Sequence, residues 1–161
     1  MRKIILFLLA IVALGLAASA GLSSTNSAPD GECFTCHADT ADSANIKMIG
    51  LPKEYVPGKT YNITLSVQSR LKSMSEIKGG FSASASAGDL IVIDEKNTQK
   101  SNSFITHTIQ GAQSRTWKLA WKAPKEKTDT EIRVMAVAAN GDYSPSGDAM
   151  TADIIAIKGK K

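Results

Sequence analysis

The C-terminal part of the chain alternates between apolar and polar residues with a period of two. The clearest run is TYNITLSVQ at residues 60–68, where Tyr61, Ile63, Leu65 and Val67 alternate with polar residues. Successive side chains of a strand point to opposite faces, so this run predicts a strand with one buried face and one wet face. The four apolar residues are expected in the core.

Similar runs follow, separated by turns. RTWKLAWKAP, at residues 115–124, puts Trp117, Leu119 and Trp121 on one face, and we expect these three in the core as well. NGDYSPSGD, at 140–148, is a dense turn signal. The other expected strands lie at residues 79–89, 90–94, 103–109, 131–139 and 150–158. Short strands separated by turns, without helical periodicity beyond the N-terminus, predict an all-β fold, an antiparallel β-sandwich.

The N-terminus follows a different pattern. Arg2 and Lys3 precede an apolar run, which ends in the small residues Ala18, Ser19 and Ala20. These are the marks of a secretory signal, and we expect cleavage after Ala20. An uncleaved anchor is the alternative, because the run is nearly long enough to span a bilayer. Either way, the protein is expected to be exported, to a periplasmic, extracellular or cell-surface location.

The chain therefore divides into four predicted parts. A signal peptide covers residues 1–20, and a flexible leader with a cysteine motif covers 21–57, including a short helical turn after the cysteines. The β-sandwich covers 58–158, and a basic tail covers 159–161.

Charge and residue types exclude several functions. The formal net charge is +4, and the signal carries two basic residues, so the mature chain carries +4 − 2 = +2. This charge is too weak, and too scattered, to indicate a nucleic-acid partner. No serine–histidine–aspartate order or carboxylate pair indicates catalysis, so we expect neither enzymatic activity nor a small-molecule substrate.

The strongest chemical signal is GECFTCHADT, at residues 31–40. It contains both cysteines of the chain, Cys33 and Cys36, followed directly by His37. C-x-x-C-H is the attachment motif of c-type haem. The two thiols form thioethers with the porphyrin, and the histidine binds the iron. The motif predicts one covalent haem c, with Cys33 and Cys36 as anchors and His37 as the proximal iron ligand.

Three other interpretations of this motif stay open. Cys33, Cys36, His37 and His107 make a Cys₂His₂ set for zinc, although zinc ligands usually come as spaced pairs. A redox dithiol normally sits in a βαβ setting, which this pattern lacks. A structural disulfide suits an exported protein but leaves the histidine unexplained.

A haem would also need covering by the sandwich, because the leader is too short and polar to bury a porphyrin. His107, in the FITHTI run, is the other histidine of the chain, and period two puts Ile105 and Ile109 on its face. We expect His107 as the distal iron ligand, with Ile105 and Ile109 packed on the haem. A core histidine with satisfied hydrogen bonds is the ordinary alternative. Other candidate ligands are the methionines Met74, Met135 and Met150.

Several of these segments together resemble a known domain. YVPGKTYNITLSV, GGFSASASAG, THT, WKLAWKAP and AANGDYSPSGD occur in the order and spacing of the reeler-like domain, an immunoglobulin-like sandwich related to the N-terminal domain of reelin. The resemblance covers residues 31–158. It is closer still to secreted bacterial and archaeal proteins that place a C-x-x-C-H segment before such a domain. SASASA after Phe81 departs from the bulkier apolar residues usual there.

The sequence thus predicts an exported monohaem c-type cytochrome that transfers electrons to a redox partner protein, with self-assembly a further possibility. The alternative is a non-catalytic, secreted interaction or adhesion β-sandwich. In that case the C-x-x-C-H is a structural disulfide or a metal site.

Overall fold

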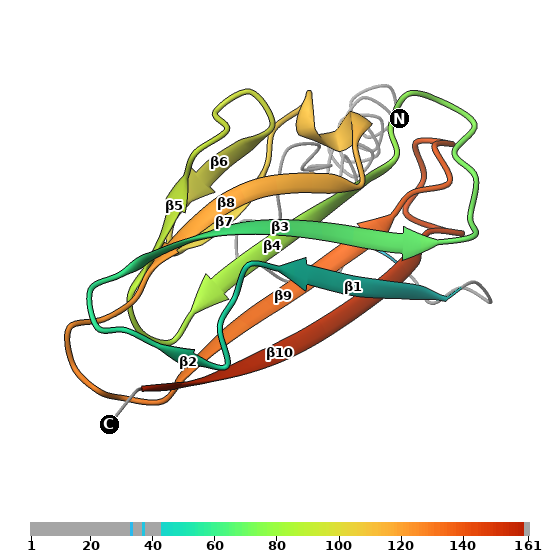
Figure 1. Cartoon of the computed structure of the whole chain (residues 1–161). Coiled ribbons are helices and arrows are strands. Elements are labelled where there is room, and N and C mark those ends of the chain that lie inside the picture. Colours follow the sequence, from blue (N-terminus) through green and yellow to red (C-terminus); the bar gives the residue numbers. More distant parts are fainter. Residues whose placement is uncertain (1–32, 34–36, 38–42, 160–161) are drawn as a thin grey trace, which may run out of the picture.

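The computed structural model describes residues 33, 37 and 43–159, and these form an antiparallel β-sandwich (Figure 1). The all-β fold class is confirmed. One sheet has the strand order β1 (Ala44–Ile49), β3 (Thr60–Ser69), β8 (Thr116–Lys122), β5 (Asp89–Val92). The other has the order β2 (Glu54–Tyr55), β10 (Ala149–Gly159), β9 (Thr130–Ala138), β4 (Gly79–Ala85), β7 (Phe104–His107), β6 (Thr98–Ser101).

Cross-strand pairs join the apolar faces that the alternation predicted. In the smaller sheet, β3 pairs with β8 so that Ile63 lies opposite Leu119 and Leu65 opposite Trp117. Directly opposed side chains share a face of the sheet, so these pairs point together into the core. The only parallel pairing in the described part of the chain joins β2 to β10.

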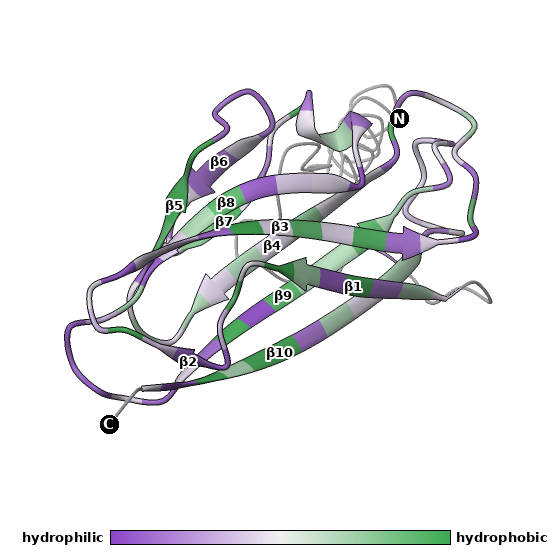
Figure 2. Cartoon of the chain, in the orientation of Figure 1, coloured by the Kyte–Doolittle hydropathy of each residue, from purple (hydrophilic) through white to green (hydrophobic). Residues whose placement is uncertain are grey.

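The core lies between the two sheets, and apolar segments of both sheets supply it (Figure 2). Its largest side chains, Trp117 and Trp121, are 1% and 0% exposed. Ile63, Leu65, Val67 and Leu119 are buried as expected. Tyr61 is only partly buried, and its ring stacks on Trp121 at 5.9 Å between centroids.

The first four residues of the SASASA segment, 82–85, belong to β4, an interior strand of the larger sheet between β9 and β7. Its Ser82 and Ala83 are 4% and 1% exposed. The Ser82 side chain and the Ala83 side chain point to opposite faces of the sheet, so β4 is covered on both sides. Small residues fit this position because bulkier ones would need more room on each face.

The residues before the predicted sandwich differ from expectation. The His37 N–H donates to the Cys33 carbonyl at 3.1 Å. Ala44–Ile49, expected to be in or near a short helical turn, instead forms β1 and pairs with β3. The helical expectation is wrong there because tertiary pairing overrides a weak local preference. β1 and β2 both precede residue 58, so the sandwich includes part of the expected leader.

Two further strands differ from expectation. The sequence pattern does not predict β6 at Thr98–Ser101, and β7 ends at His107 rather than continuing to residue 109. The predicted signal peptide, most of the leader and residues 160–161 lie outside the described residues. Within the described part, no helix has the length and apolar character needed to cross a membrane.

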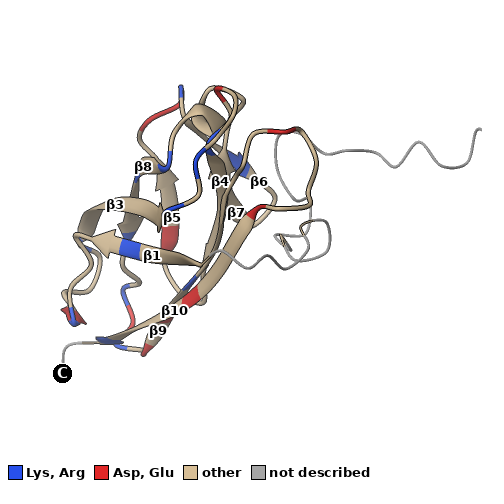
Figure 3. Cartoon of the chain, turned by 90° about the vertical axis from the view of Figure 1, so that its right-hand side faces the viewer, with Lys and Arg blue, Asp and Glu red and all other residues tan. Residues whose placement is uncertain are grey.

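Charged residues are spread over loops and strands (Figure 3). Lys47 on β1 and Asp153 on β10, for example, are both exposed.

Every strand runs between two ends of the sandwich. We call one the tyrosine end, where Tyr55, Tyr61 and Trp121 lie together. We call the other the histidine end, where β7 ends at His107 and β10 begins at Ala149.

Candidate functional site

Three loops meet at the histidine end, at residues 70–78, 108–115 and 139–148. The first and third are joined where the Met74 N–H donates to the Asn140 carbonyl at 2.7 Å. Backbone hydrogen bonds between loops fix their relative positions, so this end has a defined shape without regular secondary structure.

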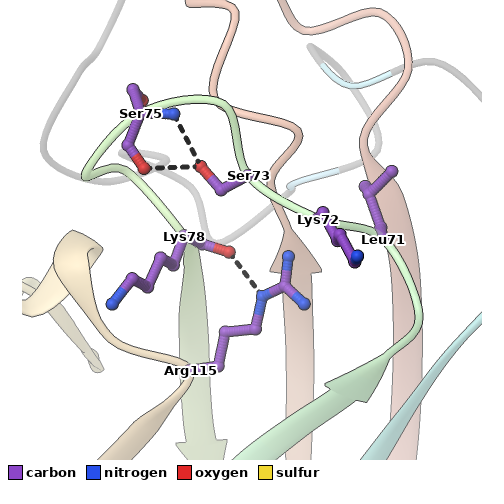
Figure 4. Close-up of a pocket in the computed structure, with 6 residues that line it drawn as sticks. All are labelled: Leu71, Lys72, Ser73, Ser75, Lys78 and Arg115. Atoms are coloured by element: carbon purple, nitrogen blue, oxygen red, sulfur yellow. Dashed lines mark hydrogen bonds between the residues drawn. The ribbon is translucent and has the colours of Figure 1, made fainter.

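Arg115 strengthens these connections (Figure 4). Its Nε donates to the Lys78 carbonyl at 2.8 Å, and its Nη2 donates to the Ala139 carbonyl at 3.1 Å. Burial lowers the pKa of Arg115, and the nearby negative charge of Asp148 acts in the opposite direction. One guanidinium therefore spans two loops beside a carboxylate.

An open cavity lies beside this arginine, and Figure 4 shows the residues that line it. Ser73 and Ser75 hydrogen-bond to each other within one turn, through the Ser75 N–H and the Ser73 hydroxyl at 3.2 Å. The Arg115 Nε is engaged by the Lys78 carbonyl, as described above.

His107 is held by the backbone of the neighbouring strand β4. Its Nδ1 lies 3.2 Å from the Phe81 backbone nitrogen and 3.3 Å from the Phe81 carbonyl oxygen. An unprotonated Nδ1 can accept the Phe81 N–H, and a protonated Nδ1 can donate to the Phe81 carbonyl. In the tautomer with the proton on Nδ1, Nε2 is unprotonated, which is the form in which a histidine binds a metal. The arrangement also satisfies the ordinary expectation of a hydrogen-bonded histidine.

Gly80 explains why the ring fits where it does. A Cβ at position 80 would lie 2.5 Å from His107 Cε1 and 2.9 Å from Nε2, distances that no real Cβ tolerates. The ring therefore occupies the space that a side chain at residue 80 would take. Glycine here permits a close approach between an imidazole and the β4 backbone.

His37 of the C-x-x-C-H motif lies at the same end. Its Nδ1 is 2.7 Å from Asp148 Oδ2, and the carboxylate side chain is only 4% exposed. The contact lies outside hydrogen-bond geometry, so we describe it as a close charge contact. It places His37 against the 139–148 loop.

The two histidines are close enough to influence each other. The pKa of His107 lies below its ordinary value of 6.5, chiefly because of burial. The bond to the Phe81 backbone opposes this shift, and a positive charge on His37 adds to it. The two imidazoles, 70 positions apart in the chain by the difference 107 − 37, thus share one electrostatic environment.

The predicted haem-packing residues occupy different surroundings. Ile105 is 1% exposed and belongs to the sandwich core, whereas Ile109 is 57% exposed. They do not share a strand face, because β7 ends at His107 and the period of two stops there. Contact of either residue with a haem remains a prediction.

Other predicted ligands stand as follows. Met74 is 75% exposed, and Met135 and Met150 are partly buried. Cys36 lies outside the described residues, so thioether formation, the disulfide and the Cys₂His₂ zinc set all remain predictions. Among the residues that the structure does describe, no group of three or more histidine, cysteine, aspartate and glutamate side chains could hold a metal ion.

Asp148 is the residue that the sequence reading missed as part of the site. It stands in a turn rich in Gly, Ser and Asp, where an aspartate ordinarily bonds to its own loop. The residues around Asp148 in the sequence do not indicate that one of its carboxylate oxygens faces His37 of the leader.

Comparison with known proteins identifies the fold. No protein-family model matches the chain, and no curated protein matches it in sequence. The structure is similar to the Reelin-N domain of F-spondin, with a TM-score of 0.51 and 20% identity over 78% of this chain and 94% of that chain. A human F-spondin reeler domain gives a TM-score of 0.47 and 21% identity, over 76% and 92%.

The first of these similarities supports a reeler-like β-sandwich, as the sequence resemblance implied. At this level of identity it establishes the fold and leaves the function open. Neither structure is described as a haem protein.

Proposed function

We propose that this protein is an exported reeler-like β-sandwich that carries one covalent haem c and transfers electrons. The observation that supports this proposal is the meeting of the two histidines. His37, from the haem-attachment motif, and His107, from β7, lie at one end of the sandwich, and the protein contacts each imidazole through Nδ1.

The residues present suit such a group. Cys33 and Cys36 would form the thioethers, and His37 and His107 would bind the iron through Nε2. A histidine whose Nδ1 faces a carboxylate or a carbonyl is the usual form of a metal-binding imidazole. A bound haem would supply an iron centre that accepts and releases one electron.

The chain's own residues would orient the site. The Phe81 backbone holds His107, and Gly80 gives its ring room against β4. Asp148 contacts His37. Ile109, exposed beyond the end of β7, offers apolar surface next to His107. A redox partner protein would approach this end of the molecule.

A second candidate function is a non-catalytic interaction or adhesion module. Its supporting observation is the fold similarity to the Reelin-N domain of F-spondin. The comparisons taken alone give this second candidate more support, because the similarity to the Reelin-N domain concerns the sandwich fold and not a haem site. The C-x-x-C-H would then be a disulfide or metal site docked on the sandwich through His37 and Asp148, and the partner would be another protein.

Haem attachment decides between the two candidates. The full chain is to be expressed in a host with a cytochrome c maturation system, and the exported product measured by intact mass and by haem staining of a denaturing gel. We expect the mass of residues 21–161 plus one haem, because thioether-bound haem survives denaturation. The double variant Cys33→Ala/Cys36→Ala is the control and should carry none. A wild-type mass equal to the bare polypeptide would reject the haem and leave the interaction module.

The distal ligand needs a separate experiment on the loaded protein. His107→Met should raise the reduction potential, because a thioether ligand stabilises ferrous iron more than imidazole does. His107→Ala should open the sixth position to added imidazole, seen as a change in the visible spectrum on titration. An unchanged spectrum and potential in His107→Ala would exclude His107. Single leucine variants of Met74, Met135 and Met150 would then identify the ligand.

A further inference from the structure

We infer that Asp148 is a positioning residue for His37, whose carboxylate sets which imidazole nitrogen faces a bound iron. This inference rests on the proposed haem function and assigns a role to a residue outside the C-x-x-C-H motif. It starts from the 2.7 Å contact between His37 Nδ1 and Asp148 Oδ2.

The carboxylate is held in a fixed orientation. Its Oδ1 accepts the Asn140 backbone N–H at 2.9 Å, which is the local bond expected of an aspartate in a turn. The same turn is braced by the Asn140 side chain, which accepts the Asp142 N–H at 3.0 Å. With Oδ1 engaged inside the loop, Oδ2 is the oxygen that faces His37.

The Asp148 carboxylate is buried, so its contacts with neighbouring groups matter for its stability. A carboxylate that is only 4% exposed loses most of its hydration, so it requires compensating partners. The basic side chains near this carboxylate are those of His37 and Arg115. The guanidinium of Arg115 donates hydrogen bonds to the Lys78 and Ala139 carbonyls. His37 is therefore the side chain that Oδ2 directly contacts.

The contact has a chemical consequence for a metal-binding imidazole. A carboxylate beside Nδ1 favours the tautomer with the proton on Nδ1, which leaves Nε2 with a free lone pair. It also makes the imidazole a stronger electron donor, which stabilises ferric over ferrous iron. Asp148 would thus both orient His37 and lower the reduction potential.

The test compares two aspartates of the same loop in haem-loaded, full-length protein. Asp148→Asn keeps an oxygen that can accept the Asn140 N–H but removes the negative charge. Asp142→Asn is the matched control, because Asp142 is exposed and its Oδ1 accepts the Ser144 N–H at 2.8 Å, within the same loop. Circular dichroism and thermal melting establish that both variants fold.

Two measurements follow. We expect Asp148→Asn to raise the reduction potential and Asp142→Asn to leave it unchanged. In ferrous protein labelled with ¹⁵N-histidine, the His37 Nδ1–H resonance should shift in Asp148→Asn, because the adjacent negative charge is removed, and should stay in place in Asp142→Asn. If Asp148→Asn does not fold, Asp148→Glu, which keeps the charge, should fold and retain a potential near that of wild type.

The outcomes separate this inference from the proposed function. If Asp148→Asn changes neither the reduction potential nor the His37 Nδ1–H resonance of the loaded protein, the positioning role is overturned and the proposed haem function is unaffected. A wild type that carries no haem overturns the proposed function, and the inference built on it falls with it.

Discussion

The two ends of the sandwich are closed by different chemistry. At the tyrosine end, Tyr55 is 0% exposed and packs edge-to-face on Trp121 at 5.3 Å between ring centroids. Its hydroxyl lies 2.6 Å from the Glu126 carbonyl and accepts the Thr128 N–H at 3.0 Å. At the histidine end, Trp117 packs on Phe81 at 4.8 Å, but the space beyond is occupied by an imidazole.

The difference shows where stability and function separate. The tyrosine end buries aromatic rings whose polar atoms are satisfied by nearby backbone, as expected of a structural closure. The histidine end collects a histidine from the leader, a histidine from a strand and a buried carboxylate from a loop. Burying titratable groups together costs solvation free energy. Such clusters therefore mark candidate functional sites. The following predictions test that contrast.

Trp121→Ala should produce the largest loss of stability. The side chain is fully buried between Tyr55 and Tyr61, so its removal leaves a cavity and should cost about 3–5 kcal/mol. Urea unfolding followed by circular dichroism measures the change. Trp117→Ala, at the histidine end, should cost a similar amount but also disturb the surroundings of His107. A cost below about 1 kcal/mol for Trp121→Ala would contradict the tyrosine end as a packed closure.

Tyr55→Phe should cost about 1–3 kcal/mol, because the Thr128 N–H loses its acceptor while the ring stays in place. Tyr61→Phe is the control, since its hydroxyl accepts the Val56 N–H in an exposed setting where water can substitute. Denaturant midpoints of the two variants give the comparison. Equal losses of stability in the two variants would show that burial of the Tyr55 hydroxyl adds nothing to the free energy of unfolding.

Gly80→Ala should destabilise the histidine end by about 1 kcal/mol, because the new methyl group overlaps the His107 ring. The ring is a movable side chain, so it can shift and limit the cost. In a His107→Ala background the same change should cost less, and a double-mutant cycle measures this coupling. Additive effects would show that the ring does not need the space above Gly80.

The smallest expected effect is on pH dependence. In haem-free protein the pKa of His107 is lowered by burial and by a positive charge on His37, with the Phe81 bond opposing. Above pH 6.5, the ordinary pKa, His107 is neutral in both folded and unfolded chains and adds no pH dependence. As the pH falls below 6.5, the unfolded chain binds the proton first, so stability decreases until the lower, folded pKa is passed.

Thermal melts of wild type and His107→Gln between pH 7.5 and 4.5 check this prediction. The wild type should lose more stability than the variant as the pH falls. His107→Gln removes the His107 imidazole and keeps the other charged groups, so the difference between the two curves reports His107 together with its coupling to His37. Parallel curves would show that His107 does not titrate abnormally.

Much of the fold could be predicted from the sequence because strand periodicity is a local property. Alternation in residues 60–68 and 115–124 identified β3 and β8 and most of their buried side chains. β1 was not predicted although its run, ANIKMI, alternates between apolar and polar residues, because the run is short and lies in a segment where a helical turn was expected. β6 was missed for a similar reason, since its sequence TQKS is short and polar.

The candidate site divides in the same way. Covalent chemistry is local, so the spacing of Cys33, Cys36 and His37 was enough to predict haem attachment. The sequence by itself thus determined most of the strand pattern and most of the core, and the haem chemistry of the motif stays a prediction. Only the tertiary structure placed His37 against Asp148 and His107 against the Phe81 backbone and Gly80. These partners lie far apart in the chain. Local sequence patterns do not determine which loops come into contact when the two sheets pack around a common core.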